Sequence, residues 1–417
     1  MKESIKKRIE AVRRGEVPEG YRIENGYLIP NDWKTVPLNR RFTRSTRKNK
    51  SGCENVLTIS AQMGLVNQRE FYDKDIASED NSSYFLMKNG EFAYNKSYST
   101  GYPYGAIKQL AKYDEGIVSP LYICFAPKAG TNTAFYTQYF EGGRYNREIY
   151  RIAQEGARNH GLLNIAVDDF FTGTLTEPGA DEQQRIAEIL ATCDRVIELT
   201  QGKIDELNKL KQTCLRKMFP QKGQTVPEAR FPGFSDPWEQ RKVSELFRVT
   251  RGYVLAATLT EPTKTDEKPY PVYSSQTKDK GLMGYYKDYL YEDAITWTTD
   301  GANAGTVNYR AGKFYCTNVC GVLLSNEVTA NQMIAEALNN VAKGYVSYVG
   351  NPKLMNNVMA DIEILIPAQA EEREQLSVFF ANLDHLITLH QRELEEYGKY
   401  KKALMQLLLT GLVRVNA

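Results

Sequence analysis

The chain carries one long amphipathic pattern twice, and this repeat restricts its possible folds more than any other feature. Residues 181–219 and 371–409 align without a gap, so that Asp181 corresponds to Glu371 and Phe219 to Leu409. Apolar side chains recur in both at alternating steps of three and four, with one stutter. Because this spacing marks a helix face buried against another helix, the repeat predicts two long helices that pack on each other in antiparallel orientation.

The predicted helices are longer than an ordinary domain needs. At 1.5 Å per residue, about 39 residues would reach roughly 58 Å, which suits a spacer between domains. The apolar seam is assigned to Ile186, Ile189, Cys193, Val196, Ile197, Thr200, Ile204, Leu207, Cys214 and Met218 in the first helix, and to Leu376, Phe379, Leu383, Leu386, Ile387, His390, Leu394, Tyr397, Leu404 and Leu408 in the second.

Each predicted helix is preceded by a stretch of roughly 130 to 150 residues, a normal size for one domain. Trp33 and Trp238 open the two stretches, and each closes on an apolar strand that runs into Pro178 or Pro367 and an acidic helical turn. The sequence thus predicts an α+β chain with two pseudo-repeated globules, separated by two long antiparallel helices that form a coiled-coil stalk.

The composition indicates in which cellular compartment the protein is expected. The chain is 25% charged and 42% apolar, and no apolar run approaches the 18 or so residues that a membrane span needs. We expect a cytoplasmic protein with no membrane partner. The six cysteines form no Cys-x-x-Cys pair, which favours reduced thiols over disulfides or zinc ligands.

Positive charge is concentrated near the N-terminus. The net charge is only +2, but residues 1–50 hold 14 Lys and Arg against 6 Asp and Glu. The densest part, residues 40–50, places hydroxyl and amide side chains between the cations, a combination suited to phosphate oxygens. A solvated loop is the alternative interpretation.

Polar loops in both globules are candidates for base recognition. Residues 94–104, 273–278, 297–305 and 350–357 are rich in polar side chains and glycine or tyrosine, and all of them except 297–305 contain Lys or Gln. Residues 94–104 have the composition of neither a helix nor a core strand, so we interpret them as a surface suited to stacking on bases. Asn and Gln can pair with adenine, and Lys or Arg with guanine. Ordinary turn chemistry is the alternative interpretation of the same residues.

No catalytic constellation is present in the sequence. Only three histidines occur, and no His, Cys and Asp cluster has metal-ligand spacing. Residues 300–305 lack the Lys-Ser/Thr that completes a phosphate-binding loop. Residues 351–353 lack the second proline and the aromatic of an adenine methyltransferase tetrad, so we expect neither a catalytic nor a metal site.

These features together resemble the specificity (S) subunits of type I restriction-modification enzymes. The likeness covers nearly the whole chain and is carried by Arg230-Phe231-Pro232-Gly233-Phe234 with Trp238-Glu239, by Pro178 to Gln183, and by Leu409-Thr410-Gly411 with Val413-Arg414-Val415. The stretch from Tyr270 to Pro367 looks like a recurrent type of target-recognition domain. Residues 1–25 fit the repeat poorly and look like an added N-terminal arm.

The resemblance implies a non-catalytic DNA-recognition subunit. Each globule would be a target-recognition domain for one half of a split double-stranded DNA sequence. Two modification subunits, which bind S-adenosylmethionine and methylate adenine, would dock on the helices Asp181 to Phe219 and Glu371 to Leu409. Restriction subunits, which use ATP and Mg²⁺, would join them to cleave DNA in defence against phage. This chain itself would hold no cofactor.

The expected division of the chain is an N-terminal arm (1–25), a first target-recognition domain (26–177), a first spacer helix (178–222), a second target-recognition domain (230–366), and a second spacer helix with the C-terminal tail (367–417). The candidate DNA-binding residues are Arg40, Arg41, Arg44, Arg47, Lys48, Lys96, Tyr98, Tyr102, Arg158, Ser275, Gln276, Lys278, Thr299, Asn303, Lys353, Asn356 and Asn357.

Two other functions remain open at this point. A coiled-coil scaffold with two protein-binding globules would share the helices, and a stand-alone DNA methyltransferase or nuclease would share the DNA contacts. The second would require the catalytic centre that the sequence lacks, whereas the first would show no sequence-dependent binding to DNA.

Overall fold

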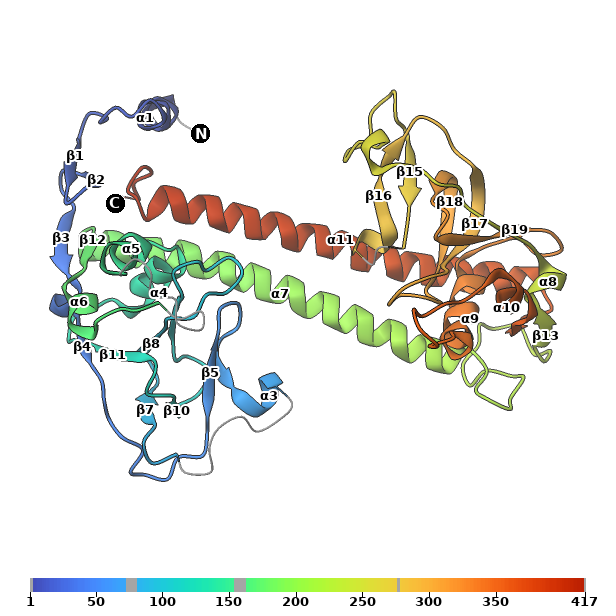
Figure 1. Cartoon of the computed structure of the whole chain (residues 1–417), viewed down its shortest axis with the longest axis horizontal. Coiled ribbons are helices and arrows are strands. Elements are labelled where there is room, and N and C mark those ends of the chain that lie inside the picture. The colour runs from blue at the N-terminus through green and yellow to red at the C-terminus, as the bar shows by residue number, and fades with distance from the viewer. Residues whose placement is uncertain (1–2, 73–80, 154–162, 276–277, 416–417) are drawn as a thin grey trace. The chain divides into compact units, whose positions relative to one another are not determined.

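The computed structural model describes residues 3–72, 81–153, 163–275 and 278–415. The chain divides into two compact units, Met1–Leu199 with Leu394–Ala417 and Thr200–Glu393, called unit 1 and unit 2 below. Each unit combines one globule with half of each of two long helices, α7 (Ala180–Met218) and α11 (Ala370–Leu408) (Figure 1).

The two long helices confirm the prediction to within one residue at each end. Both are 39 residues long, as the gapless alignment of the two segments requires. Acidic residues occupy the first turn of each, Asp181 and Glu182 in α7 and Glu371 and Glu372 in α11, where they interact favourably with the helix dipole.

Within each unit the helix halves run antiparallel. In unit 2, Lys211 bonds Asp384 at 2.7 Å, and directly after the end of α7 the ring of Phe219 lies 5.7 Å from the ring of Phe380. In unit 1, Lys401 pairs with Asp194. Asp384 and Lys401 occupy the positions in α11 that Asp194 and Lys211 occupy in α7, so both units contain the same contact with the roles of the helices exchanged.

The stutter assigned to the seam is wrong. Leu190 and its counterpart Phe380 are completely buried, whereas Val196 is 37% exposed and Leu386 is 40% exposed. The seam therefore continues from Ile186 through Leu190 in regular heptad steps. Near the globules a helix is covered on more than one side, and Ile189 packs on the unit 1 core. Apolar spacing alone could not distinguish that packing from the seam.

The unit 1 globule is built from short strands and helices. Its elements are α1 (Glu3–Arg13), β1 (Tyr21–Glu24), β2 (Tyr27–Pro30), β3 (Lys34–Pro37), α2 (Leu38–Arg41), β4 (Phe42–Arg44), β5 (Leu57–Ser60), β6 (Gly64–Asn67), α3 (Gln68–Tyr72), β7 (Phe85–Lys88), β8 (Phe92–Asn95), β9 (Ala106–Gln109), β10 (Glu115–Val118), β11 (Ile123–Pro127), α4 (Thr133–Glu141), α5 (Asn146–Ile152), α6 (Val167–Thr172) and β12 (Thr174–Glu177). Among the described residues its largest sheet is a four-stranded antiparallel one, β4-β11-β8-β9, and four further sheets have two strands each.

The boundary expected after residue 25 falls in the turn between β1 and β2. Asn25 and Gly26 both have positive φ, as the tight turn of such a hairpin requires. The N-terminal segment also bonds the C-terminal tail. Arg8 donates to the Leu412 carbonyl at 2.6 Å, and Tyr21 donates to the Gly411 carbonyl at 2.5 Å.

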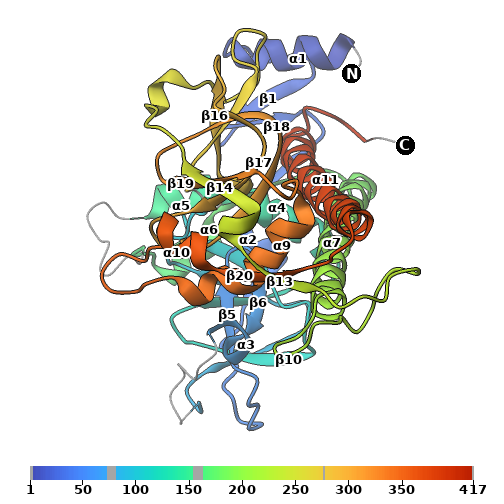
Figure 2. The same ribbon diagram turned by 90° about the vertical axis from the view of Figure 1, so that its right-hand side faces the viewer.

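The unit 2 globule has a larger sheet. Its elements are β13 (Glu239–Lys242), α8 (Val243–Leu246), β14 (Phe247–Arg251), η1 (Ala257–Leu259), β15 (Tyr270–Tyr273), η2 (Lys278–Gly281), β16 (Leu282–Tyr286), β17 (Tyr291–Thr298), β18 (Val307–Cys316), β19 (Cys320–Ser325), α9 (Gln332–Val341), η3 (Ala342–Tyr345), α10 (Asn356–Asp361) and β20 (Glu363–Ile366). Six strands form one sheet in the order β14-β19-β17-β18-β15-β16. Helix α9 packs on β18 and β20, and α10 packs on α8 and β14 (Figures 1 and 2).

The chain enters and leaves both globules in the same way. The buried Trp33 and Trp238 precede a strand that pairs with the last strand before the long helix, β3 with β12 and β13 with β20. A short helix and a sheet strand follow in each case. The pairing brings the entry and the exit of each globule together at the start of a long helix.

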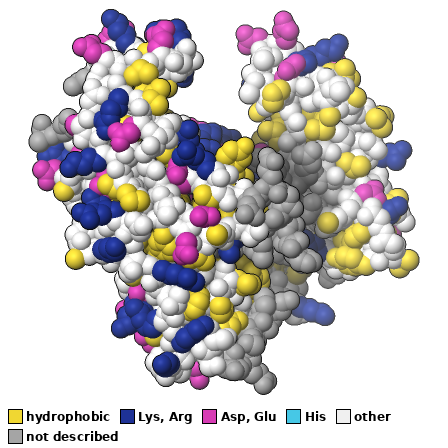
Figure 3. Space-filling model, turned by 60° about the vertical axis from the view of Figure 1, so that its left-hand side comes forward, with side chains coloured by type: hydrophobic (Ala, Val, Ile, Leu, Met, Phe, Trp, Pro, Cys, Tyr) yellow, Lys and Arg dark blue, Asp and Glu magenta, His cyan; other side chains and the backbone are white. Residues whose placement is uncertain are grey.

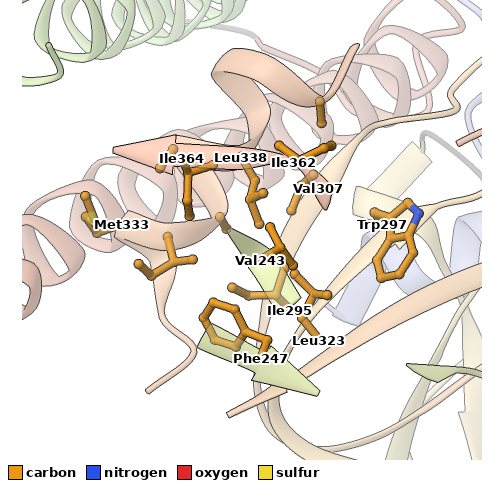
Figure 4. Close-up of a cluster of buried hydrophobic side chains, with 14 of the residues drawn as sticks. Val243, Phe247, Ile295, Trp297, Val307, Leu323, Met333, Leu338, Ile362 and Ile364 are labelled. Carbon is orange, nitrogen blue, oxygen red and sulfur yellow. The ribbon is translucent and has the colours of Figure 1, made fainter. Parts of the chain in front are cut away.

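The unit 2 core fixes the sheet against its helices. Ile295, Leu323 and Trp297 from the sheet belong to one hydrophobic cluster with Met333 and Leu338 of α9, and Figure 4 shows Ile295 and Leu323 near its centre. Burial of each such side chain contributes about 1.5–3 kcal/mol. Trp297 also requires a glycine on β19, because a Cβ at Gly321 would lie 2.1 Å from the indole. This packing positions the loop that follows β17.

Candidate nucleic-acid interface

Two of the four candidate arginines near the N-terminus have internal partners. The Nε of Arg41 in α2 donates to the Glu177 carboxylate at 2.9 Å, and Tyr136 donates to the same buried carboxylate. The hydrogen bond to Glu177 raises the pKa of Arg41. Arg47 pairs with the buried Glu91 at 3.1 Å. These contacts give Arg41 and Arg47 structural roles.

Arg40 and Arg44 are placed differently. Both side chains are exposed, and neither forms an ion pair with any residue in the described ranges. Lys48 is exposed as well, although its ammonium group donates to the Ser83 carbonyl at 2.7 Å and lies over the ring of Phe85. On the face shown in Figure 3, Lys and Arg side chains occur singly or in small groups with Asp and Glu among them. The contacts of each cation therefore separate free candidates for DNA binding from structural residues better than the local density of charge does.

Replacing Arg40 or Arg44 with Gln should weaken binding to all DNA sequences alike. Each change removes an exposed cation and should lower the slope of log K against log salt by about one, without altering sequence preference. The measurement is a salt titration of the assembled complex on specific and unrelated duplexes. Arg41→Gln is the comparison, because it should mainly lower stability by leaving the buried Glu177 carboxylate without its cation. Relaxed specificity in the Arg40 or Arg44 variant would assign that residue to a base.

The loop candidates of unit 1 separate into core and surface residues. Tyr94 belongs to β8, is fully buried and stacks on Phe170 with ring centres 5.1 Å apart. Because β8 ends at Asn95, the prediction that residues 94–104 lie outside a core strand is wrong for its first two residues. Tyr98 is 59% exposed, and Lys96 is half-buried. Tyr102 is half-buried and donates to Glu141 at 2.6 Å. Arg158 lies outside the described residues. The pattern missed Tyr94 because aromatic alternation in β8 continues directly into the polar loop.

The candidates of unit 2 surround two neighbouring loops. Thr299 is buried and donates to the Val319 carbonyl at 3.0 Å, so it fixes its loop. Lys353 is 51% exposed, lies 3.8 Å from Asp300 and pairs with it as a β-bridge. The Asn303 amide is 3.5 Å from the Ser275 carbonyl. The structure thus brings Ser275 to Asn303, and Lys353 to the loop of Thr299.

The last two candidates lie at the start of α10. Asn356 donates to the Thr250 carbonyl at 3.3 Å, whereas Asn357 is exposed. Two residues that the sequence did not single out are also prominent in unit 2, Tyr348 at 71% exposed and Val349 at 93%. Gln276 and the side chain of Lys278 lie outside what the structure describes.

A cavity of about 150 Å³ lies between the candidate loops of unit 2. Sequence reasoning missed its most informative residue, Arg310, whose side chain is buried on β18. The signal available was weak, because Arg310 lies within a strand and belongs to no dense cluster of cations, with Lys313 as the other basic residue of β18. The residues that line the cavity are Ser274, Lys280, Thr296, Trp297, Thr298, Asn303, Thr306, Asn308, Arg310 and Cys320.

Each unit also carries an exposed apolar patch on its helices. In unit 1 the patch is Val196 and Leu199 of α7 with Tyr400 of α11, and in unit 2 it is Leu386 and Leu389 of α11 with Leu210 of α7. Each member of one patch has its counterpart at the equivalent helical position in the other. The two groups are called the unit 1 patch and the unit 2 patch below.

The patches lie on the side of the seam away from the globule. Val196 and Leu386 immediately precede a seam position, whereas Asp194 and Asp384 immediately follow one, so the two pairs flank the seam on opposite sides. Asp194 accepts from Gln138 of the unit 1 globule at 2.7 Å, and Asp384 accepts from Gln332 of the unit 2 globule at 3.2 Å. The globule therefore covers one side and leaves the apolar side exposed.

The described parts of the chain do not meet the requirements of a metal site, a disulfide or a membrane-spanning helix. No group of three or more His, Cys, Asp or Glu side chains there is placed to hold a metal ion. All six cysteines are free thiols. Among the same residues, no helix has the length and apolarity of a membrane span.

Several known proteins are similar to this chain in sequence. Residues 235–397 match the family model described as the type I restriction modification DNA specificity domain. The N-terminal part of a type I specificity subunit from Mycoplasma pneumoniae is 40% identical over 126 residues, which cover 30% of this chain and 66% of that protein. The MjaX specificity subunit of Methanocaldococcus jannaschii is 23% identical over 416 residues, covering 93% of this chain and 95% of that protein.

The fold is similar to that of a solved structure. The crystal structure of the type I restriction-modification S subunit from M. genitalium aligns with a TM-score of 0.59 at 14% identity, over 95% of this chain and 99% of that one. Among the M. pneumoniae relatives, the chain spans between 45% and 66% of each protein's length.

Proposed function

The chain belongs to the specificity subunits of type I restriction-modification systems, and from this premise we propose that its two globules each read one half of a split DNA sequence. The helices would fix the separation between the two readers and hold two modification subunits that methylate adenine. Restriction subunits would join this assembly to cleave DNA in the cytoplasm. The chain would act without catalysis of its own.

The observation that carries this proposal is the duplicated contact within the two units. Lys211 with Asp384 in unit 2 and Lys401 with Asp194 in unit 1 are the same pair with the helices exchanged. A surface that repeats itself in this way is self-complementary, and it can present one binding site twice to two copies of one partner. The unit 1 and unit 2 patches supply that site, because matched apolar side chains remain exposed on both.

The cofactors would then belong to the partners. S-adenosylmethionine would bind to the modification subunits, and ATP with Mg²⁺ to the restriction subunits. A scaffold or a stand-alone enzyme would have no need for two equivalent docking surfaces beside two different globules.

Exchange of one globule tests the proposal. Replacing residues 238–366 with the corresponding domain of another specificity subunit should change one half of the methylated sequence and leave the other half and the spacing intact. Both junctions lie at the paired strands β13 and β20, so the graft keeps the entry and exit of the globule together. Methylome sequencing of cells that express the exchanged chain with its modification subunit gives the result.

The matched control exchanges residues 33–177, which should change only the other half of the methylated sequence. A change in both halves after a single exchange would mean that the globules do not read DNA independently. An unchanged methylated sequence after both exchanges would assign recognition to another subunit.

A further inference from the structure

Arg310 is a cation held rigidly inside the unit 2 sheet. Its side chain is only 6% exposed, and its guanidinium lies 3.7 Å from the centre of the Tyr273 ring. The Nε donates to the Thr296 hydroxyl at 3.0 Å, and one terminal nitrogen donates to the Lys280 carbonyl at 2.7 Å. These neutral partners orient the guanidinium without cancelling its charge.

The charge of Arg310 has no carboxylate partner within ion-pair distance among the described residues. Lys280, the other cation beside the cavity, already pairs with Asp384 at 3.1 Å. Burial lowers the pKa of Arg310, but a guanidinium stays protonated in proteins. A buried charge of this kind is costly to fold unless a counter-charge or several polar groups surround it.

The cavity beside Arg310 is lined by groups that can bind an anion. Asn303 and Asn308 provide amides, and Thr298 and Thr306 provide hydroxyls. None of the lining residues is acidic. Hydroxyl and amide donors beside one unneutralised guanidinium are the chemistry that binds phosphate oxygens, because each neutral donor adds a hydrogen bond to the charge attraction.

We propose that this cavity is a phosphate-binding site in which Arg310 contacts a backbone phosphate of the DNA read by unit 2. Loops on either side of it, around Ser275 and Asn303, carry candidate DNA-binding residues, so a duplex at those loops brings phosphates to the cavity. The inference rests on the proposed function and adds to it a single phosphate contact made from inside the sheet. The contact anchors the globule on the duplex and reads no base.

Two other roles for Arg310 make different predictions. As a purely structural residue it would link β17, η2 and Tyr273, and phosphate would then have no effect. If Arg310 instead recognised guanine, it would bind the edge of a neutral base. The buried charge of the guanidinium would then have no counter-charge. The phosphate alone supplies the missing negative charge, and for that reason we favour it.

The first experiment uses inorganic phosphate and the full chain. Phosphate should raise the midpoint of thermal unfolding of the unchanged chain beyond the effect of chloride at equal ionic strength, because it binds only the folded state. Arg310→Met should remove this increase, and Arg251→Met should keep it. Arg251 is an exposed arginine on the same sheet and does not line the cavity. If Arg310→Met fails to fold, Asn308→Ala, which keeps Arg310, should still reduce the increase.

The second experiment uses DNA and the chain assembled with its modification subunits. Arg310→Met should weaken binding to specific and unrelated duplexes alike by about 10- to 100-fold, the value of a charge-assisted hydrogen bond. It should also lower the salt slope by about one. If Arg310→Met left the salt slope unchanged, Arg310 would not contact a DNA phosphate. If inorganic phosphate nevertheless stabilised the unchanged chain, the cavity would be a site for a free anion.

The outcomes separate this inference from the proposed function. The phosphate site itself is overturned if phosphate raises the thermal midpoint equally in the unchanged chain and in the Arg310 and Asn308 variants. It is also overturned if phosphate raises the midpoint in none of them. Relaxed preference at one base pair in Arg310→Met would assign Arg310 to guanine. The proposed function fails instead if the unchanged complex shows no sequence-dependent binding to DNA.

Discussion

Replacing Arg230 with Met should lower the free energy of unfolding of unit 2 by about 3–5 kcal/mol, the cost of leaving a buried charge without its partner. Arg230 donates through Nε and one terminal nitrogen to the two carboxylate oxygens of Glu372, at 2.6 and 2.7 Å. The Glu372 side chain is 1% exposed, so water cannot replace the lost donors. Urea unfolding, followed by the tryptophan fluorescence to which the buried Trp238 contributes, measures the loss.

Two comparisons isolate the ion pair. The double variant Arg230→Met with Glu372→Leu should recover most of the lost stability, because it removes both charges together. Lys217→Met breaks the pair between Lys217 and Glu228, whose side chains are 42% and 65% exposed, and should cost less than about 1 kcal/mol. A loss of similar size in Arg230→Met and Lys217→Met would show that burial of Glu372 is unimportant.

Leu199→Glu combined with Leu389→Glu should abolish binding of both modification subunits. Leu199 in the unit 1 patch is 62% exposed, and Leu389 in the unit 2 patch is 42% exposed. A charge at the centre of an apolar interface should cost more than about 2 kcal/mol, or roughly 30-fold in affinity for each site. Because the patches are equivalent, either single variant should bind one modification subunit instead of two.

Native mass spectrometry of the assembled complex counts the bound subunits directly. Leu121→Glu is the matched control, since Leu121 is 66% exposed on the unit 1 globule and belongs to neither patch. If one single variant lost both modification subunits, or the double variant still bound two, the docking surface would lie elsewhere on the chain.

The helices were predictable from sequence because their signals are local. Heptad spacing and the acidic first turns fixed α7 and α11 to within one residue. The position of the seam was less certain. Ile189 and Leu190 are both apolar, and only the globule packed on α7 determines which of them faces the other helix.

The roles of individual cations were not predictable, because ion pairs depend on distant parts of the chain. Glu177 is 136 residues from Arg41, and Glu91 is 44 residues from Arg47, so a local cluster of charge could not show that these two arginines have internal partners. Arg310 was missed for the opposite reason. It belongs to no dense cluster of cations in the sequence, and only the folded sheet places it beside Asn303.

The duplicated ion pair also bears on how such a gene can originate. A polypeptide with one globule and one helix already contains both an aspartate and a lysine equivalent to Asp194 and Lys211, so two copies of it have the side chains needed to pair. Duplication and fusion of that gene would preserve the contact while leaving each globule free to diverge. This chain shows that pattern, because its helices align without a gap whereas the largest sheets of its globules differ, with four strands in one and six in the other.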